Sequence, residues 1–515
     1  MMQRPRTIPE RNSQVMTNDD TTPRDTNPGP IDLEALHHNS FKVMMNDVVE
    51  AGSCCECGTC VLVCPHNVID YVDGKPKQTA KESAAFDFCG ISEGVGCDVC
   101  ATVCPRLWPR ETHLRDAVFR DERPYEDIFG VYRQIFVART TRSDVMERAQ
   151  DGGIVTALLS WARATGEIDG AVVSAVGDED KPCFPTPKVV TTEDEIRNSA
   201  SSWYTYCENN LALEEVKQRD LKQVGFVGVP CQITPLRKMA HMDPAFLATD
   251  KKRPKPLARQ REFLRGYSDR VAFSIGLFCT EVFRPELMTE RIEQQMGIPL
   301  TDVTKFNVKG EVLIYKRDKT IATIPLEEAM RDYQRPECRH CGDFSAEMAD
   351  IACGGVGTDA ATIVVIRTAK GEEIWRKFQA AGNVELMPIN ENKRAWNILQ
   401  RLARRQRDRI PPGSIRSGTA DSLPQYAPAD AAAISERRRD VNAKSAAELG
   451  EALATAYGDE TRPNETIRYM AGQPIPGDPG APPPGQKRKL PPPPPPEAGG
   501  APPGWGEVTG SPAGD

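Results

Sequence analysis

The sequence predicts a mixed α+β and α/β protein, in which a small cysteine-rich module precedes a larger α/β domain and both chain ends are disordered. Nine of the sixteen cysteines fall between residues 54 and 104, and eight of these nine form two closely spaced runs. From about residue 134 onward, short β-branched apolar runs alternate with helical stretches, which is typical of α/β domains. Both ends are polar or proline-rich and hold few large apolar residues. We therefore expect four regions: a disordered leader (1–30), the cysteine-rich module with a short leading helix (31–115), the α/β domain (116–410) and a low-complexity tail (411–515).

Charge and hydropathy exclude several classes of protein. The chain carries 65 Lys and Arg against 73 Asp and Glu, so it has no excess positive charge with which to bind nucleic acid. No apolar run reaches the roughly 18 residues that a membrane-spanning helix needs. The first residues do not lead into an apolar stretch of the kind found in signal peptides. We expect a cytoplasmic protein without a transmembrane segment.

Two helices are predicted at the borders of the folded region. Apolar residues recur at near-helical spacing before the first cysteine run: Leu33, Leu36, Phe41, Met44, Val48 and Val49. A second helical pattern covers residues 395–408 and ends before Pro411 and Pro412. The tail adds a weak helical stretch near residues 440–457 and six prolines at 491–496, which favour an extended polyproline helix.

The two cysteine runs have the spacing of iron–sulfur ligands. They read Cys54-x2-Cys57-x2-Cys60-x3-Cys64-Pro65 and Cys89-x7-Cys97-x2-Cys100-x3-Cys104-Pro105. Bacterial ferredoxins with two 4Fe-4S clusters use this order, and the fourth cysteine of each run binds the other cluster. We expect one cluster on Cys54, Cys57, Cys60 and Cys104, and a second on Cys64, Cys89, Cys97 and Cys100. Structural zinc also uses CxxC pairs, but eight ligands followed twice by Cys-Pro favour clusters. Cys55 is left over and is interpreted as a buried bystander.

Behind this ferredoxin-like module the pattern is that of an α/β domain. Five apolar runs have strand length: 134–138, 170–176, 224–229, 271–278 and 362–367. Residues 154–164 are helical in pattern and follow Asp151, Gly152 and Gly153. Glycines at a helix start let backbone N–H groups approach a phosphate. A plain turn is the other interpretation of this glycine pair.

Four more cysteines stand at strand ends or in a loop. Cys231 and Cys279 each follow an apolar strand, whereas Cys338 and Cys341 form a CxxC pair. Together they could converge on a further cluster. Taken singly, a cysteine with apolar neighbours is a small core residue, and this interpretation is kept for three others: Cys183, Cys207 and Cys353.

Several short motifs in one order resemble the beta subunits of coenzyme F420-reducing hydrogenases and dehydrogenases. They are Asp151-Gly152-Gly153-Ile154-Val155-Thr156-Ala157-Leu158-Leu159, Val229-Pro230-Cys231-Gln232, Gly276-Leu277-Phe278-Cys279 and Cys338-x2-Cys341-Gly342-Asp343-Phe344. The resemblance covers about residues 54–371. It implies that the protein binds FAD and 4Fe-4S clusters, and that hydride passes between FAD and coenzyme F420, which is a deazaflavin. Single electrons would then pass through the clusters to a partner redox protein or complex, such as a hydrogenase, dehydrogenase, ferredoxin or respiratory complex. The chemistry belongs to the cofactors, so no catalytic side chain is expected.

The resemblance also implies site residues. The expected flavin contacts are Asp151, Gly152, Gly153, Thr156, Ser202, Tyr204, Gly228, Pro230, Lys305 and Asn307. A third cluster beside the flavin is expected on Cys231, Cys279, Cys338 and Cys341. In the alternative assignment Cys231 only packs against the flavin and Cys353 is the fourth ligand. The basic residues Arg237, Lys238, Lys305 and Lys309 either meet the anionic tails of FAD or the deazaflavin, or are solvated surface charges.

Two departures from the family pattern leave alternatives open. Trp203 stands where the family has a lysine between Ser202 and Tyr204, and Val229 stands where threonine is common. The chain could therefore be an electron-relay or adaptor subunit without flavin, or a ferredoxin-dependent reductase of the chlorophyll-pathway type. The family includes a subunit that feeds membrane respiratory complexes, so a position at the periphery of such a complex is also compatible. His37, His38 and His340 are interpreted as incidental.

Overall fold

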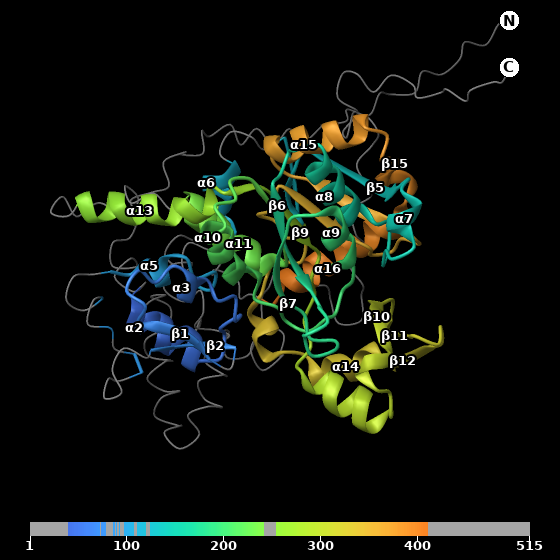
Figure 1. The fold of residues 1–515 in the computed structure, drawn as a ribbon, viewed down its shortest axis with the longest axis horizontal. Coiled ribbons are helices and arrows are strands. Elements are labelled where there is room, and N and C mark those ends of the chain that lie inside the picture. The colour runs from blue at the N-terminus through green and yellow to red at the C-terminus, as the bar shows by residue number, and fades with distance from the viewer. Residues whose placement is uncertain are drawn as a thin grey trace, which may run out of the picture.

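The computed structural model describes residues 40–72, 74–78, 86–87, 89, 92, 97–107, 111–119, 124–241 and 254–409. The predicted leader (1–30), Leu33 and Leu36 of the leading helix, and the tail (411–515) with its weak helix and prolines lie outside the described residues. Figure 1 shows a large sheet with helices on both sides. The cysteine-rich front module (residues 40–107) lies beside it, and a small unit built on a three-stranded sheet lies at another edge.

The central sheet is mixed and has eight strands. Its order is β15 (Val384–Pro388), β5 (Gln134–Thr140), β14 (Thr362–Ile366), β13 (Ile351–Gly354), β9 (Val271–Leu277), β8 (Val224–Gly228), β6 (Gly170–Ala175) and β7 (Thr186–Val190). The four middle strands from β13 to β6 are parallel, and antiparallel strands flank them on both sides. Buried parallel strands read as continuous apolar runs, which explains why β6, β8 and β9 were visible in the sequence.

Alternate residues of the strands build two apolar cores. Val137, Ile363 and Val365 face the core that also holds Trp396 of α16 (Lys393–Arg407), together with α10 (Ala212–Gln218) and α11 (Pro230–His241). Phe136 and Val364 face the opposite core, which contains α8 (Ile154–Ala164) and α15 (Ala369–Ala380). Successive strand residues point to opposite faces, so the sheet is covered on both sides (Figure 1).

The remaining elements form smaller groups. The front module contains α2 (Phe41–Val43), the π-helix η1 (Met44–Glu50), α3 (Thr59–Leu62), β1 (Ile69–Val72), β2 (Lys75–Gln78) and α5 (Val99–Thr102). The small unit contains η3 (Leu287–Gln295), η4 (Leu300–Asp302), β10 (Val303–Val308), β11 (Glu311–Lys316), β12 (Ile321–Pro325) and α14 (Leu326–Tyr333). Connecting elements are α6 (Glu111–Phe119), β3 (Tyr125–Asp127), β4 (Gly130–Tyr132), α7 (Ser143–Met146), α9 (Glu193–Asn198), η2 (Asn209–Leu211), α13 (Pro254–Ser268), η5 (Pro336–His340) and η6 (Ile389–Glu391). None of the helices in the described ranges is long and apolar enough to cross a membrane.

The predicted mixed α/β fold with a large sheet is confirmed. All five predicted strands are present, as β5, β6, β8, β9 and β14, and helix 154–164 is α8 with the same bounds. Helix 395–408 corresponds to α16, which begins two residues earlier. The described end of the predicted leading helix is α2 followed by η1, a change from α- to π-type winding that the spacing did not reveal. The sequence did not predict β7, β13, β15 or the small sheet, and the division into four regions stays a prediction.

Candidate functional site

A cavity lined by cysteines lies where two parallel strands end. Strands β8 and β9 pair with Gly228 beside Gly276, so their carboxyl ends meet at one edge of the sheet. Cys231 is in the first turn of α11, directly after β8, and Cys279 follows β9 by two residues. The carboxyl ends of strands in open α/β sheets are the usual place for a ligand crevice. The fold therefore places both thiols at such an edge.

The CxxC pair reaches the same edge from a different part of the chain. Cys338 lies in η5 and Cys341 directly follows it. The amide of Val282 donates to the sulfur of Cys338 (3.4 Å), and the amide of Cys279 donates to the carbonyl of Phe344 (2.8 Å). These bonds hold the loop of the CxxC pair against the segment after β9. Cys231, Cys279, Cys338 and Cys341 are called the sheet-edge cysteines below.

The sheet-edge cysteines line a cavity with about 360 Å³ of space not filled by protein atoms. Burial raises the pKa of Cys279, and the nearby thiols of Cys338 and Cys341 raise it further. Burial also raises the pKa of Cys338, although Arg335 opposes this effect. Ionised thiols would need a compensating positive charge here, which a bound metal group supplies. The donor set is therefore suited to a metal–sulfur group.

The front module brings its eight predicted ligands into two sets. A second cavity, with about 260 Å³ of unfilled space, is lined by the four cysteines expected to share one cluster: Cys64, Cys89, Cys97 and Cys100. The other four are called the inner front cysteines: Cys54, Cys57, Cys60 and Cys104. Among these, Cys60 interacts electrostatically with Cys54 and Cys104, and Cys57 interacts with Cys60.

The cysteines carry no disulfide. All sixteen are described as free thiols. Among the described residues, no group of three or more His, Cys, Asp or Glu side chains is arranged to hold a metal ion. The preference for clusters over zinc stays a prediction from the cysteine spacing.

Buried cations join the front module to the sheet domain. The guanidinium of Arg106 donates to the carbonyls of Ser53 (3.0 Å), Glu337 (3.0 Å) and His340. The ammonium of Lys238, which is fully buried in α11, donates to the carbonyls of Cys104 and Leu107 (2.5 Å each). The bonds of Lys238 place the segment at Cys104, one of the inner front cysteines, next to α11.

The predicted flavin residues gather mainly around the loop before α8. The amide of Gly152 donates to the hydroxyl of Thr362 (3.0 Å), and a β-carbon at position 152 would lie 2.5 Å from the carbonyl of Ala138. Gly153 has a φ of +68°, which favours glycine. Burial raises the pKa of Asp151, and an ion pair with Lys309 (2.8 Å) opposes that rise. A tight backbone turn at the start of an eleven-residue helix results.

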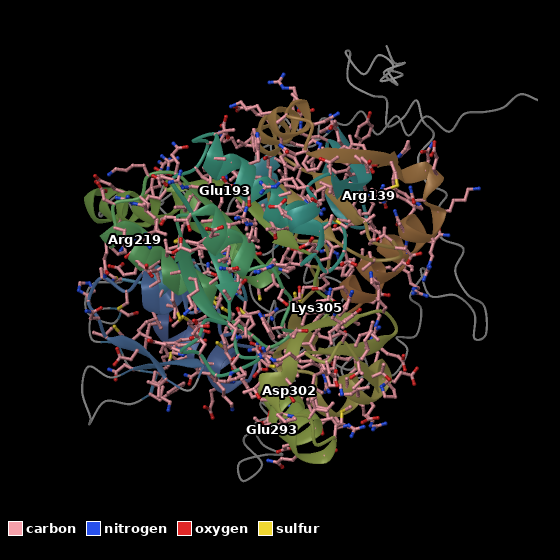
Figure 2. All side chains as sticks on the ribbon, turned by 45° about the vertical axis from the view of Figure 1, so that its right-hand side comes forward. Arg139, Glu193, Arg219, Glu293, Asp302 and Lys305 are labelled. Atoms are coloured by element: carbon pink, nitrogen blue, oxygen red, sulfur yellow. The ribbon has the colours of Figure 1, made fainter. Side chains whose placement is uncertain are left out.

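Polar side chains from the small unit meet this loop. The ammonium of Lys305 donates to the carbonyl of Ala149 (3.1 Å), and Figure 2 shows Lys305 where the small unit meets the sheet domain. The side-chain Nε2 of Gln150 donates to the hydroxyl of Tyr204 (2.7 Å) and to the side-chain oxygen of Asn307 (3.2 Å). Two buried polar atoms here, Oε1 of Gln150 and Oγ of Ser201, have no hydrogen-bond partner in the structure. These atoms are free to bind a polar ligand.

The other predicted flavin residues are placed differently. Pro230 lines the cavity of the sheet-edge cysteines, and Gly228 ends β8 two residues before it. Thr156 lies in the first turn of α8. Ser202 is half-buried in the segment that leads to Tyr204. The hydroxyl of Tyr204 accepts a hydrogen bond from the side chain of Gln150, and the charges of Asp151 and Cys279 add to the effect of burial in raising its pKa.

Two of the predicted basic residues bond other parts of the protein, and the alternative cluster ligand Cys353 lies away from the cavity. Lys238 bonds the front module, and the guanidinium of Arg237 donates to the carbonyl of Met348 (2.7 Å) and pairs with Asp350 (2.8 Å). Cys353 is buried in the sheet core, away from the cavity lining. The structure therefore gives no support to Cys353 as the fourth ligand in place of Cys231.

One family description matches most of the α/β domain in two parts. Residues 135–214 match the N-terminal part, and residues 221–392 match the C-terminal part, of the family described as "Coenzyme F420 hydrogenase/dehydrogenase, beta subunit". The coenzyme F420 hydrogenase subunit beta of Methanosarcina barkeri is 35% identical over 286 residues, which cover 55% of this chain and 90% of that protein. The chain belongs to this beta subunit family.

One further curated relative agrees with this assignment. The coenzyme F420-dependent sulfite reductase of Methanocaldococcus jannaschii is 32% identical over 355 residues, or 68% of this chain. The match spans half the length of that protein. A chain in a solved structure of the F420-reducing [NiFe] hydrogenase complex from Methanosarcina barkeri is 34% identical and has a TM-score of 0.49, covering 55% of this chain and 92% of that one. The expected enzyme class is confirmed at the level of the family, whose matched members are named as F420-dependent oxidoreductases.

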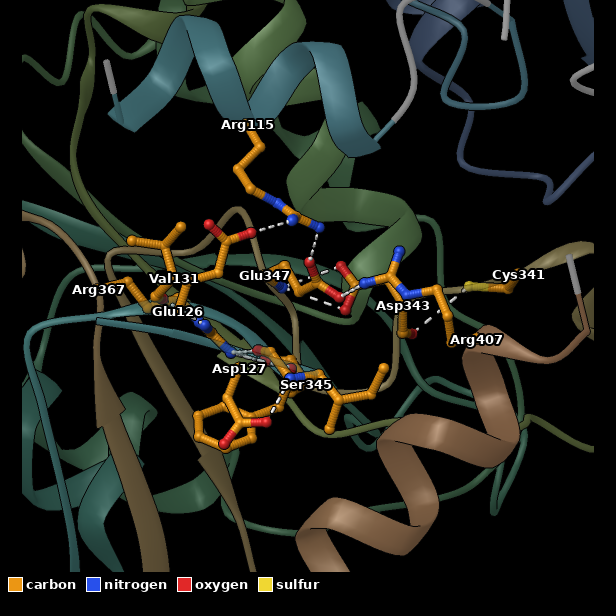
Figure 3. A network of polar contacts seen from close by, with 12 residues as sticks. Arg115, Glu126, Asp127, Val131, Cys341, Asp343, Ser345, Glu347, Arg367 and Arg407 are labelled. Carbon is orange, nitrogen blue, oxygen red and sulfur yellow. Dashed lines mark hydrogen bonds and ion pairs between the residues drawn. The ribbon is translucent and has the colours of Figure 1, made fainter. Parts of the chain in front are cut away.

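In this member of the beta subunit family, a buried polar network lies behind Cys341. The sulfur of Cys341 donates to the carbonyl of Asp343 (3.6 Å), and the carboxylate of Asp343 accepts from the amide of Glu347 (2.9 Å). Glu347 is paired with Arg115 (2.8 Å) and with Arg407, as Figure 3 shows. The network fixes the loop after the CxxC pair, because it ties that loop to α6 and α16.

Sequence reasoning missed several residues of this beta subunit site. Cys55 is buried, as expected, and it lines the cavity of the sheet-edge cysteines, whereas its interpretation as a bystander stays a prediction. Tyr206 also lines the cavity, with its hydroxyl 3.7 Å from the sulfur of Cys231. Arg335 lies over the ring of Tyr206 (4.3 Å) and pairs with Glu56 of the front module (2.5 Å). The sequence pointed to Cys55 only by its position within the first cysteine run. No sequence motif marked Tyr206 or Arg335 as residues of the cavity.

Proposed function

We propose that this chain is an iron–sulfur flavoprotein oxidoreductase. It would transfer hydride between coenzyme F420 and FAD, and single electrons through 4Fe-4S clusters to a partner redox protein or complex. One observation carries this proposal: the sheet-edge cysteines converge on a single cavity at the carboxyl ends of β8 and β9. A cluster there would be a one-electron acceptor for a flavin bound at the same domain.

The residues present fit the proposed iron–sulfur groups. The sheet-edge cysteines would hold one 4Fe-4S cluster, and the two sets of the front module would hold one each. Thiolates are the usual ligands of such clusters, and each set belongs to one cavity or one interacting group. Apolar residues such as Val63, Val99 and Val103 are buried in the front module and would keep water away.

The loop before α8 fits a flavin nucleotide. The turn at Gly152 and Gly153 leads directly into α8, and the N-terminus of a helix is a common binding place for a phosphate. Lys305 and Lys309 bring positive charge to the same loop. Ser202, Tyr204 and Asn307 would contact the flavin or position its neighbours, and the free buried oxygens of Gln150 and Ser201 await polar partners. When bound, FAD takes up two electrons as hydride and releases them singly, which the clusters accept one at a time.

The family relationship supports coenzyme F420 as the hydride substrate. The matched hydrogenase subunit and the sulfite reductase both carry this coenzyme in their names. The hydrogenase relatives are named as subunits of a larger enzyme. We therefore propose that this chain works with a redox partner, which receives or supplies electrons at the front module.

One observation favours a second candidate function, that of an electron-relay subunit without flavin. Trp203 replaces the lysine of the family pattern, and its ring packs edge-on against Phe306 (6.2 Å). A positive charge is thereby absent at this turn. A chlorophyll-pathway type of reductase is not favoured by any feature of the described site.

Anaerobic mixing with coenzyme F420 tests the proposal. The reconstituted protein should carry bound flavin and should reduce the coenzyme when a low-potential donor supplies electrons. Absorbance of the coenzyme and of the flavin reports both steps. A protein with full iron content that binds no flavin and leaves the coenzyme unchanged would instead be the relay subunit.

A further inference from the structure

Arg106 lies where the front module meets the cavity of the sheet-edge cysteines. It follows Cys104, one of the inner front cysteines, by two residues. Its side chain is buried, with 5% of the residue exposed, and it lines the cavity of the sheet-edge cysteines. A cation of the front module therefore forms part of the wall of a site that the sheet domain builds.

On the front side, the guanidinium of Arg106 ties the two cysteine runs together. Its Nε donates to the carbonyl of Ser53 (3.0 Å), and Ser53 directly precedes Cys54. Cys54 begins the first run, whereas Cys104, two residues before Arg106, ends the second run. The bond therefore joins the backbone beside two of the four inner front cysteines.

On the sheet side, the same guanidinium holds the turn of the CxxC pair. Its Nη2 donates to the carbonyl of Glu337 (3.0 Å), the residue before Cys338. Its Nη1 donates to the carbonyl of His340, the residue before Cys341. Arginine presents its N–H donors in one rigid plane, so a single side chain fixes several carbonyls in one arrangement. A lysine, with one nitrogen on a flexible stem, lacks that geometry.

We propose that Arg106 is a positioning residue for electron transfer between the inner front cysteines and the sheet-edge cysteines. The inference rests on the proposed function, because it needs a cluster at each of the two sites. One electron given up at one site is taken up at the other, and no bond forms or breaks at Arg106. Electron transfer slows steeply as two redox centres move apart. By bonding the backbone beside ligands of both sites, Arg106 would fix the distance between them.

The charge of Arg106 has a second effect that can be measured separately. A site that takes up an electron becomes more negative, and a nearby buried cation stabilises that state. Charge and hydrogen bonding around a cluster set its reduction potential. Arg106 should therefore raise the potential at both sites that it bonds. It is not among the described residues that line the other front cavity, at Cys64 and Cys89, so the potential there is an internal reference.

Three variants of the full chain test this role after anaerobic reconstitution. Arg106→Gln removes the charge and the fork of donors, whereas Arg106→Lys keeps the charge and loses the fork. Lys238→Met is the matched control. Lys238 is a fully buried cation at the same contact and bonds the carbonyl of Cys104, but it is not among the described residues that line the sheet-edge cavity.

Four quantities are measured in each variant. They are the iron content, the potential of each cluster from redox titrations followed by electron paramagnetic resonance, the magnetic interaction between reduced clusters, and the rate at which reduced coenzyme F420 reduces the front clusters. We expect all three variants to retain about twelve irons, four for each cluster.

The expected results separate the charge of Arg106 from its geometry. Arg106→Gln should lower the potential at the inner front and sheet-edge sites by about 59 mV, a tenfold change in the equilibrium constant of a one-electron step. Arg106→Lys should keep both potentials, weaken the magnetic interaction and slow reduction of the front clusters roughly tenfold, the lower range for loss of a group that supports metal ligands. Lys238→Met should lower the potential at the inner front site and leave the sheet-edge potential unchanged.

Several results would overturn the inference. Unchanged potentials and an unchanged rate in Arg106→Gln would show that Arg106 has no such role. An equal fall of the sheet-edge potential in Lys238→Met would show that any loosening of the contact has the same effect. If Arg106→Gln loses iron, Arg106→Lys decides, and either a normal rate or iron loss in that variant overturns the inference. Failure of the proposed function looks different, since the unaltered protein would then lack the clusters or the flavin.

Discussion

At the scale of single residues, the sheet-edge site depends on thiols that come from three separate segments. Cys231 starts a helix, Cys279 ends a strand segment, and Cys338 belongs to a short 3₁₀ helix. Burial raises the pKa of Cys279 and Cys338, so neither ionises readily alone. Metal binding would release their protons and tie the three segments together. Each ligand should therefore matter for iron content more than for the fold.

Replacing Cys338 with serine is expected to remove about four of about twelve irons. The hydroxyl is a poorer ligand for iron than a thiolate, and the loop keeps its other bonds through Phe344. Iron and acid-labile sulfide per chain measure the loss, and flavin absorbance measures what remains. Cys353→Ser is the matched control, because Cys353 is buried in the sheet core. If Cys353→Ser lost iron and Cys338→Ser did not, Cys353 would be the cluster ligand and Cys338 would not.

The free energy of unfolding is expected to depend on pH through the buried carboxylate of Asp350. Burial alone would raise its pKa, but the guanidinium of Arg237 and hydrogen bonds from Ser274 and Thr368 hold the pKa below its ordinary value. A carboxylate with a depressed pKa stabilises the fold above the unfolded value, near 3.9, and loses that contribution as pH falls through the folded value.

Asp350→Asn should lower the free energy of unfolding by about 3 kcal/mol at pH 7, because Arg237 loses its buried partner. The difference between the two proteins should shrink as the pH falls below about 4. Denaturant unfolding over a series of pH values measures both. A difference that stays constant down to the lowest pH would contradict this role of Asp350.

At the scale of elements, the turn before α8 is the most constrained part of the proposed flavin site. Thr140 donates its amide to the carbonyl of Gly152 (2.8 Å), and Gly152 donates to Thr362 (3.0 Å). The turn is thus bonded to β5 and to β14 at once. A side chain at position 152 has no room between these strands.

Gly152→Ala is expected to destabilise the fold by about 1–3 kcal/mol, as overpacking in a tight site does, and to lower the fraction of chains that carry flavin. Its β-carbon would lie 2.5 Å from the carbonyl of Ala138. Gly266→Ala in α13 is the control, since a β-carbon there meets no atom within 4 Å. Flavin absorbance per chain and denaturant unfolding are the measurements. Full flavin occupancy in Gly152→Ala would show that the turn does not hold the cofactor.

The same scale shows what the sequence could reveal. Strands such as β8 and β14 are buried on both faces, so they read as unbroken apolar runs. Strand β15 alternates exposed and half-buried residues, and β13 has only four residues that end in glycine. Such short or polar strands lack a distinct pattern. The CxxC spacing marked Cys338 and Cys341, whereas the place of Cys55 depends on how the front module packs, which no local pattern encodes.

At the scale of the whole molecule, buried hydrogen bonds set how the front module meets the sheet domain. Arg106 and Lys238 together donate to carbonyls on both sides of the contact, and Arg335 pairs with Glu56 across it. Unpaired buried carbonyls cost about 1–3 kcal/mol each, so these cations specify one arrangement. That arrangement places Cys104, one of the inner front cysteines, beside α11.

Arg409, the last described residue, defines the last prediction. Arg409 donates to the carbonyls of Thr280 (2.7 Å) and Cys338 (3.1 Å) and pairs with Glu281 (3.0 Å), so it closes the loops around the sheet-edge cavity. The sequence beyond residue 412 is polar and rich in proline, and we predict from this composition that it contributes little to the core.

A chain that ends at residue 412 should therefore keep its full iron and flavin content and its electron transfer. A chain that ends at residue 408 lacks Arg409, and its free energy of unfolding should be lower by about 1–3 kcal/mol, because two buried carbonyls lose their donor. Iron, flavin and denaturant unfolding compared across the two truncations and the full chain provide the test. Loss of iron or flavin already at residue 412 would place part of the tail in the folded core, and equal stability of both truncations would show that Arg409 does not close the cavity.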